Sequence, residues 1–209
     1  MEKTKKNKLV KAWVNQHVND HYVHLAKKDG YRSRAAYKLL EIDEIDNLFS
    51  KVKVIIDLGC APGSWSQVAL KKIGARGLVI GVDILEMIPI PGVRFIQGDF
   101  TEIETFNELI KEINNEKVDL ILSDMSPNLS GIKNIDQAKL AYLVELVLDF
   151  AAKHLKTGGN CLIKVFNGLE FNNLIKLARK DFTEVVIRKP NSSRSKSSET
   201  YLLCKNKKN

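Results

Sequence analysis

The chain has 209 residues, 44% of them hydrophobic, which suits one compact domain with a buried core. No apolar run reaches the roughly 18 residues of a membrane-spanning helix, and the lysine-rich start lacks the apolar segment of a secretory signal. We therefore expect a cytoplasmic protein that does not enter a membrane. The three cysteines are odd in number and widely separated, which indicates neither a disulfide framework nor a thiolate zinc site.

The net charge of +8 is concentrated at the two ends of the chain. Residues 1–38 carry ten Lys or Arg and three acids, and residues 188–209 carry seven and one, whereas the middle is net acidic. A basic excess attracts polyanions through counterion release, and the bland alternative is that lysine-rich termini only aid solubility. We favour nucleic acid binding by basic residues that flank the apolar elements: Lys28, Arg32, Arg34, Arg194 and Lys196.

Apolar periodicity and turn signals predict alternating helices and strands. We expect a basic extension over residues 1–30, with a helix over 9–26, followed by a single domain over residues 31–209. Ser33 is expected to cap a second helix, which ends near Ile45. The remaining expected elements are a strand at 52–56, a helix capped by Ser64, strands at 79–83 and 95–99, a helix at 101–114, a strand at 118–123, a helix at 135–155 ended by 157–159, a strand at 161–166, a helix at 169–179, and strands at 183–188 and 200–204. The last two strands could form an antiparallel pair, joined by a polar loop over 190–198 that we expect to be mobile.

The segment Asp-Leu-Gly-Cys-Ala-Pro-Gly-Ser-Trp-Ser-Gln, residues 57–67, joins the first expected strand to a helix. Gly59 and Gly63 permit backbone conformations and close ligand approach that a Cβ would obstruct. Such a turn binds ligands at the carboxyl end of its strand. A dinucleotide fingerprint would require glycine at position 61 and glycine or alanine at position 64, where the chain has Ala61 and Ser64. The pattern therefore favours a nucleoside without a pyrophosphate, against the alternative of a turn that binds nothing.

Two acids end the next two expected strands. Asp83 stands 20 residues beyond Gly63, where a ribose-binding carboxylate belongs. An ionised carboxylate can accept from both hydroxyls of a ribose. Asp99 could accept from an adenine amino group, although either acid alone could be an ordinary turn former. Together with the glycine loop, the two acids predict a cofactor site.

Four charged residues stand on separate elements. Asp124 follows the strand at 118–123, and Lys164 lies in an apolar strand, where an ammonium group is costly to bury without partners. Lys38 lies on the second expected helix, and Glu199 precedes the last strand. Taken singly, Lys38 and Glu199 are typical of surface charges.

The chain resembles the FtsJ family of methyltransferases. Residues 57–65 are similar to the family's cofactor motif D-x-G-x-x-P-G-x-[FW], and Lys38, Asp124, Lys164 and Glu199 match its K-D-K-E tetrad in order. Matching segments also include residues 31–35, 123–128 and 188–190, so the resemblance covers nearly the whole chain. It implies a Rossmann-like α/β fold of the class I methyltransferases: a mostly parallel seven-stranded sheet with an antiparallel last strand and helices on both faces.

The resemblance also implies an activity. The cofactor would be S-adenosyl-L-methionine, bound by Gly59, Gly63, Trp65, Asp83, Asp99 and Asp124. The reaction would be methylation of a ribose 2'-hydroxyl, of a uridine in large-subunit ribosomal RNA, by a monomer that does not bind DNA. Lys164 would act as base or oxyanion stabiliser, Asp124 would orient it, and Lys38 with Glu199 would complete the network. Burial and Lys38 favour loss of the Lys164 proton, whereas the two carboxylates oppose it, so the sequence leaves this balance open.

Other functions fit the sequence less well. Amino methylation of a base usually employs a [DNS]-P-P-[YFW] motif, and residues 124–127 lack both the paired prolines and the aromatic. Methylation of cytosine C5 needs a nucleophilic cysteine, yet Cys60 lies in the cofactor loop and Cys161 begins an apolar strand. A non-catalytic RNA-binding assembly factor is the alternative from another class, and the intact loop and tetrad argue against it. Three histidines share one expected helical face, but nothing nearby completes a metal site, so no metal is expected; they are His17, His21 and His24.

Overall fold

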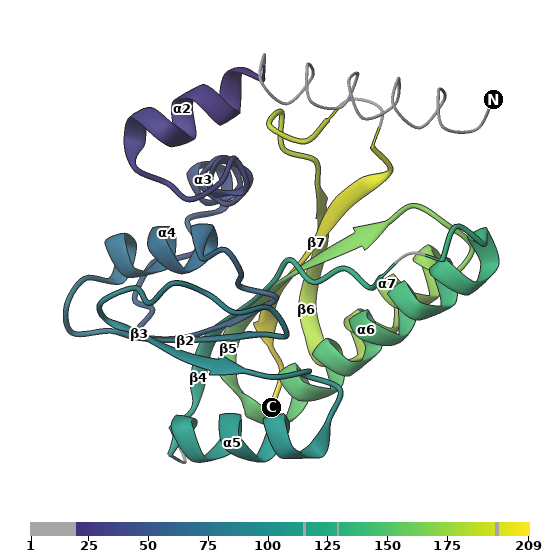
Figure 1. The fold of residues 1–209 in the computed structure, drawn as a ribbon. Helices are drawn as coiled ribbons and strands as arrows, with labels where there is room; N and C mark the ends of the chain where they lie inside the picture. Colours follow the sequence, from purple (N-terminus) through teal and green to yellow (C-terminus); the bar gives the residue numbers. More distant parts are fainter. Residues whose placement is uncertain (1–19, 115, 129, 195–196) are drawn as a thin grey trace.

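The computed structural model describes residues 20–114, 116–128, 130–194 and 197–209. One seven-stranded sheet runs through this part of the chain in the order β3-β2-β1-β4-β5-β7-β6 (Figure 1). Strands β1 to β5 are parallel, and β7 is antiparallel to both of its neighbours, which confirms the predicted fold class. The strands are β1 Val54–Leu58, β2 Leu78–Asp83, β3 Val93–Gln97, β4 Val118–Ser123, β5 Leu155–Phe166, β6 Phe182–Arg188 and β7 Glu199–Lys207.

Helices cover both faces of the sheet (Figure 1). One face carries α3 Ala35–Asp46 and α4 Ser64–Ile73, and α2 His21–Asp29 lies against α3. The other face carries α5 Ile103–Ile113, α6 Lys133–His154 and α7 Phe171–Asp181. None of the helices in the described ranges is long and apolar enough to cross a membrane.

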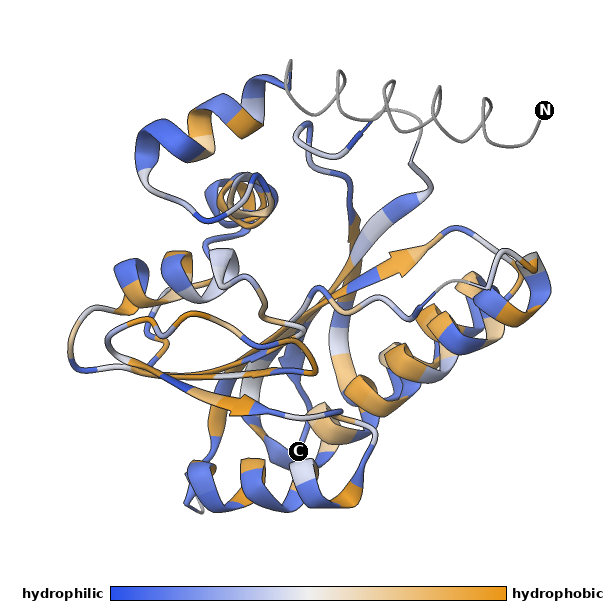
Figure 2. Ribbon diagram, in the orientation of Figure 1, coloured by the Kyte–Doolittle hydropathy of each residue, from blue (hydrophilic) through white to orange (hydrophobic). Residues whose placement is uncertain are grey.

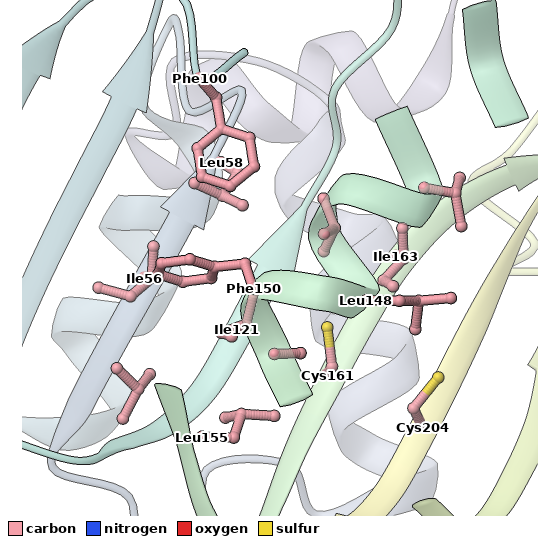
Figure 3. Close-up of a cluster of buried hydrophobic side chains, with 14 of the residues drawn as sticks. Ile56, Leu58, Phe100, Ile121, Leu148, Phe150, Leu155, Cys161, Ile163 and Cys204 are labelled. Carbon is pink, nitrogen blue, oxygen red and sulfur yellow. The ribbon is translucent and has the colours of Figure 1, made fainter. Parts of the chain in front are cut away.

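Two apolar layers hold the sheet between these helices. The strands β1 and β4 are buried along their whole length, as expected for parallel strands covered on both faces, and the hydropathy colouring shows apolar residues along the centre of the sheet (Figure 2). On the α5–α6–α7 face, Phe150 packs edge-on against Phe100 with ring centroids 5.5 Å apart (Figure 3). Cys161 and Cys204 are buried in the same layer as free thiols. This packing fixes the strand ends that carry polar residues.

Two elements begin at residues other than the predicted ones. Most of the helix predicted over 9–26 lies outside the described residues, but Asp20 has extended backbone angles and its carboxylate accepts from Tyr22 N, so a helix starts at His21. Strand β5 starts at Leu155, six residues before the predicted start, because Leu155 is buried and pairs with Val118. A register shift in the β4–β5 ladder accommodates this early start, so residues 157–159 lie in the strand and do not end the helix.

The N-caps of α3 and α4 are also not the predicted serines. Gly63 is the N-cap of α4, and the Ser64 hydroxyl instead lies 2.7 Å from the Ser33 hydroxyl. Arg34 is the N-cap of α3, while Ser33 Oγ accepts from Ala35 N at 3.2 Å. The paired serines therefore join the start of α3 to the start of α4, which follows the glycine loop.

The other end of α3 is fixed to the sheet by Asp46. Its carboxylate accepts from Arg188 on β6 at 2.7 and 2.8 Å, and Lys205 on β7 lies 2.7 Å away. Burial alone would raise the pKa of Asp46, but the hydrogen bonds from Arg188 and Lys205 outweigh burial and lower it. Helix α3, which carries Lys38, is thus held at both ends.

Candidate active site

A cavity of about 610 Å³ lies at the carboxyl ends of β1 to β4, the edge where open parallel sheets bind ligands. Its volume is that of an ordinary small-molecule site. The residues that line it come from the glycine loop, the ends of β2 and β3, the segment after β4, and α6; they include Gly59, Asp83, Asp99, Phe100, Asp124 and Tyr142. The cavity therefore contains both predicted acids and one member of the tetrad.

The two loop glycines are needed for different reasons. Gly59 lines the cavity with φ +75°, and a Cβ there would lie 2.9 Å from the backbone of Met125. Gly63 has φ +105°, and a Cβ would meet Ile90 Cδ1 at 2.6 Å and Met87 Sδ at 2.8 Å. The space in front of Gly63 is thus filled by the protein's own side chains, so its role is conformational.

Asp83 has a carboxylate that is already partly engaged. Its Oδ2 accepts from Ala61 N and its Oδ1 from Leu85 N, both at 2.8 Å. A carboxylate has about four acceptor positions, so each oxygen retains capacity for one further donor. Two vicinal hydroxyls of a ribose would match that capacity, and Asp83 at the same time ties the glycine loop to the end of β2.

Asp99 combines the two roles weighed for it. Its Oδ1 accepts from both the backbone N and the hydroxyl of Thr101 at 2.8 Å, which is the behaviour of a turn former. The residue is exposed and lines the cavity together with Phe100. The turn therefore presents the carboxylate at the end of β3.

Trp65 does not line the cavity. Its side chain is 2% exposed, its indole Nε1 donates to Ala35 O at 2.8 Å, and its ring packs against Tyr201 at 5.6 Å. The structure thus gives Trp65 the role of holding α4 against α3, and not the cofactor contact that the sequence analysis expects of it.

Arg32 also has a structural role. Its guanidinium donates to Pro62 O at 2.9 Å and to Pro89 O at 3.0 Å, and it also contacts Ile88 O. Its backbone N donates to Gln67 Oε1 at 2.9 Å. Arg32 therefore clamps the glycine loop to the loop after β2, and this geometry does not support a phosphate contact by the same guanidinium.

The tetrad forms two ion pairs on the α3 face of the sheet. Lys164 Nζ lies 3.2 Å from Asp124 Oδ1 and donates to Asp124 O at 2.5 Å. Lys38 Nζ lies 2.7 Å from Glu199 Oε1. All four side chains are less than 20% exposed, so each charge is mostly removed from water and compensated by its partner. The four residues predicted from separate elements are therefore brought together.

Tyr201 joins the two pairs and was missed from the sequence. It is the direct cross-strand partner of Lys164, and its hydroxyl lies 2.9 Å from Asp124 Oδ1 and 3.3 Å from Glu199 Oε1. Burial and the two carboxylates raise the pKa of Tyr201 well above its usual value, so the hydroxyl keeps its proton as a donor. Strand alternation was the available signal, because Tyr201 stands two residues after Glu199 and shares its face.

The pKa values of two carboxyl groups near the site are shifted in opposite directions. Burial tends to raise the pKa of Glu199, but the charges of Lys38 and Lys164 and the hydrogen bonds to the carboxylate outweigh it and lower the pKa. Asp57, on β1 below the loop, is fully buried, and burial raises its pKa to about 7 with a further contribution from Asp124 and Asp83. Glu199 is therefore an anion in its ion pair, whereas Asp57 titrates near neutrality.

The predicted RNA-binding residues fall into three groups. Arg34 pairs with the Asp20 carboxylate and donates to Ser192 O, which joins α3 to the segment after β6, residues 189–194. Lys28 is exposed in the last turn of α2, and Arg194 is half-buried two residues after Ser192. Lys196 lies outside the described residues. The described parts of the two basic ends thus meet beside the tetrad.

No metal centre emerges from the described ranges, in which no group of three or more His, Cys, Asp or Glu could hold an ion. His21 and His24 are exposed on α2, and His17 lies outside these ranges.

The strand order, the antiparallel β7 and the cavity at the strand ends define a Rossmann-like methyltransferase fold. Residues 31–207 match the family described as FtsJ-like methyltransferase, and the chain belongs to that family. The chain is 55% identical over 199 residues to ribosomal RNA large subunit methyltransferase E of Methylobacillus flagellatus, covering 95% of this chain and 96% of that protein. It is 54% identical over 203 residues to the protein of the same name from Neisseria meningitidis, covering 97% and 98%.

Solved structures agree with this assignment. A ribosomal RNA methyltransferase structure from Plasmodium falciparum superposes with a TM-score of 0.75 and 38% identity, covering 85% of this chain and 98% of that one. Fibrillarin of Aeropyrum pernix, solved with bound S-adenosyl-L-methionine, gives a TM-score of 0.56 at 20% identity, covering 83% and 75%, and supports the fold alone.

Substitution of Tyr201 by Phe should reduce the turnover of the enzyme. The ring would stay packed on Trp65, but both carboxylates would lose the hydroxyl, and a hydrogen bond to a charged group contributes roughly 1.5 to 3 kcal/mol. We expect kcat to fall about tenfold or more. The melting temperature should fall by a few degrees, because two buried carboxylates lose a shared donor, so kcat is compared at a temperature at which the variant is folded. The control is Tyr37→Phe, which removes a hydroxyl bonded to the exposed Asp29 instead. Equal kcat values for the two variants would contradict the bridging role.

Proposed function

We propose that this protein is an S-adenosyl-L-methionine-dependent methyltransferase that modifies a ribose 2'-hydroxyl, of a uridine in large-subunit ribosomal RNA. The observation that carries the proposal is the position of Asp124, which lines the cavity and is paired with Lys164 in the tetrad. A methyl donor in the cavity and a hydroxyl at the tetrad would therefore meet at this residue. The substrate assignment is supported by the large-subunit enzymes to which the chain is more than half identical.

The residues around the cavity suit this cofactor. When bound, it supplies a methyl group activated by a positively charged sulfur. Asp83 retains two acceptor positions for its ribose, Asp99 in the cavity wall would accept from its adenine amino group, and Gly59 lets the Met125 backbone pack closely against the loop. The loop offers no phosphate-binding fingerprint, in keeping with a nucleoside that carries no phosphate.

The tetrad supplies the proton chemistry. A 2'-hydroxyl is a weak acid, so the protein must orient it and remove its proton as charge develops on the oxygen. Lys164 Nζ is held by both the carbonyl and the carboxylate of Asp124, which supports a role for it in accepting that proton or in stabilising the oxyanion. Glu199 is joined to Asp124 through the Tyr201 hydroxyl, and its ion pair with Lys38 brings the second cation of the tetrad to the same cluster.

RNA binding is assigned to the two basic ends. Lys28 and Arg194 present charges on the side of the molecule where α2, α3 and the segment after β6 meet, and Lys196 follows this segment in the sequence. Arg34 contributes by holding this surface together. We take residues 1–30 as a basic extension and residues 31–209 as one methyltransferase domain, acting as a monomer in the cytoplasm without contact to DNA or membrane.

The direct test is transfer of a labelled methyl group to large ribosomal particles from cells that lack the protein. Mapping of methylated ribose by mass spectrometry should place the label on one uridine, and a non-catalytic assembly factor would give no incorporation. Cells with and without the protein should differ at that same nucleotide. Incorporation into a base instead of a ribose would overturn the proposal.

Substitution of Lys164 by Met should abolish turnover while leaving cofactor affinity intact. A positioned acid–base group contributes on the order of 10² to 10⁴ in rate, and Lys164 does not line the cavity. Lys164→Arg keeps the charge but cannot lose its proton, so recovery of activity in this variant would assign an oxyanion role. The control is Lys153→Met on an exposed ion pair of α6. Near-normal turnover of Lys164→Met would contradict the mechanism.

Substitution of Asp83 by Ala should weaken S-adenosyl-L-methionine binding about tenfold or more, since each hydrogen bond to the carboxylate is worth roughly 1.5 to 3 kcal/mol. Because Asp83 also accepts from Ala61 N and Leu85 N, the melting temperature is measured beside calorimetric affinity. Glu86→Ala, an exposed change in the same loop, is the control. An unchanged affinity in a folded Asp83→Ala protein would remove Asp83 from the site.

Removal of Lys28 and Arg194 together should reduce the salt dependence of RNA binding by about two units of slope, because each phosphate contact contributes about one. The Michaelis constant for ribosomal particles should rise while cofactor affinity stays the same. Arg34 is left in place because its contacts are structural. The matched control removes Lys111 and Lys176 from α5 and α7 on the opposite face. A salt slope equal to that of the control would refute the RNA-binding role.

A further inference from the structure

The segment after β6 contains two neighbouring serines that are buried beside the tetrad. Ser192 is 0% exposed and Ser193 is 7% exposed, although the serine-rich sequence predicts a mobile polar loop. Ser193 Oγ donates to Glu199 Oε1 at 3.0 Å. Ser192 Oγ has no hydrogen-bond partner among the described residues. The two adjacent hydroxyls therefore differ in their contact with Glu199, which Ser193 makes and Ser192 does not.

The backbone of Ser192 fixes where this segment lies. Its N donates to the Glu41 carboxylate at 3.1 and 3.2 Å, and its carbonyl accepts from Arg34, so both groups are held by α3. Lys189 Nζ donates to Ser197 O and to Glu199 O, which closes the segment onto the start of β7. These contacts hold Ser193 against the Glu199 carboxylate.

Glu199 Oε1 receives three groups from three different elements. They are Lys38 Nζ at 2.7 Å, Ser193 Oγ at 3.0 Å and Tyr201 OH at 3.3 Å. Because Tyr201 also bonds Asp124 at the shorter distance of 2.9 Å, its share in holding Glu199 is the weaker one. Ser193 is thus the principal neutral donor that orients the carboxylate, and the carboxylate in turn orients Lys38.

Arg194 follows Ser193 directly and is half-buried. Its carbonyl accepts from Ser197 N at 2.9 Å, so Arg194 belongs to the same stretch of chain that is closed onto the start of β7. A phosphate bound at Arg194 would therefore add a charged contact directly beside the residue whose hydroxyl is bonded to Glu199.

We propose that Ser193 is a positioning residue that couples RNA binding to the tetrad: a phosphate at Arg194 stabilises the segment, and the Ser193 hydroxyl transmits this to Glu199 and Lys38. The inference rests on the proposed function, since it requires RNA to be the substrate. Ser193 acts through Glu199 and contacts no substrate atom itself.

The test compares Ser193→Ala, Ser193→Thr and Ser192→Ala in the full chain, with ribosomal particles as substrate. Loss of the Ser193 hydroxyl should lower kcat about tenfold, as one hydrogen bond to a charged group predicts, with little change in the Michaelis constant for the cofactor. Ser193→Thr keeps the hydroxyl and should recover most of kcat, and Ser192→Ala should behave as wild type. Unchanged kcat in Ser193→Ala, or equal losses in all three variants, would overturn the proposal.

A double-mutant cycle tests the coupling. Arg194→Ala should lower kcat in the wild-type background but have no further effect on kcat in the Ser193→Ala background, because the transmitting hydroxyl is already absent. Independent, multiplicative losses would refute the coupling. These outcomes are separate from the failure of the proposed function, in which the wild-type protein itself would transfer no methyl group to ribose.

Discussion

The site depends on the burial of two ammonium groups and two carboxylates together at one edge of the sheet. Desolvation of each isolated ion would cost several kcal/mol, so none of the four could be held there without its partners. Lys164 pairs with Asp124 and Lys38 pairs with Glu199, which leaves the group with no net charge. The protonated hydroxyl of Tyr201 then lies between the two carboxylates and reduces their mutual repulsion. The rest of the fold serves to bring these five side chains to one place.

Four of the five are positioned by the sheet. The antiparallel register sets Tyr201 opposite Lys164, strand alternation places Glu199 on the same face as Tyr201, and Asp124 directly follows the end of β4, which pairs with β5. Lys38 comes from outside the sheet and needs α3 to be fixed independently. The ion pairs of Asp46, the Ser33–Ser64 contact and the Trp65–Ala35 hydrogen bond provide this at both ends of the helix.

Asp124 connects this charged cluster to the cavity. Its side chain belongs to the tetrad, and the segment that it begins forms the wall facing Gly59, whose missing Cβ allows the Met125 backbone to approach. The loops on the other side are joined by Asp83 and by Arg32, each through backbone hydrogen bonds. A cofactor would thus enter a cavity whose loops are held by hydrogen bonds between the side chains of Asp83 and Arg32 and main-chain atoms. These bonds do not depend on which side chains the bonded loop residues carry.

The sequence by itself predicted the helices and strands in chain order, because apolar runs and turn glycines are local patterns. The mostly parallel sheet and the tetrad were predicted from the resemblance to the FtsJ family. The sequence also placed Asp83 and Asp99 at the ends of two strands. Because the carboxyl ends of parallel strands meet at one edge, both acids could be expected beside the glycine loop. Only the tertiary structure decided the roles of Trp65 and Arg32, which depend on partners about 30 residues away or more. The same holds for Ser193 and for the early start of β5 at Leu155, because a hydroxyl beside a carboxylate and a buried leucine acquire their meaning from packing that no local pattern records.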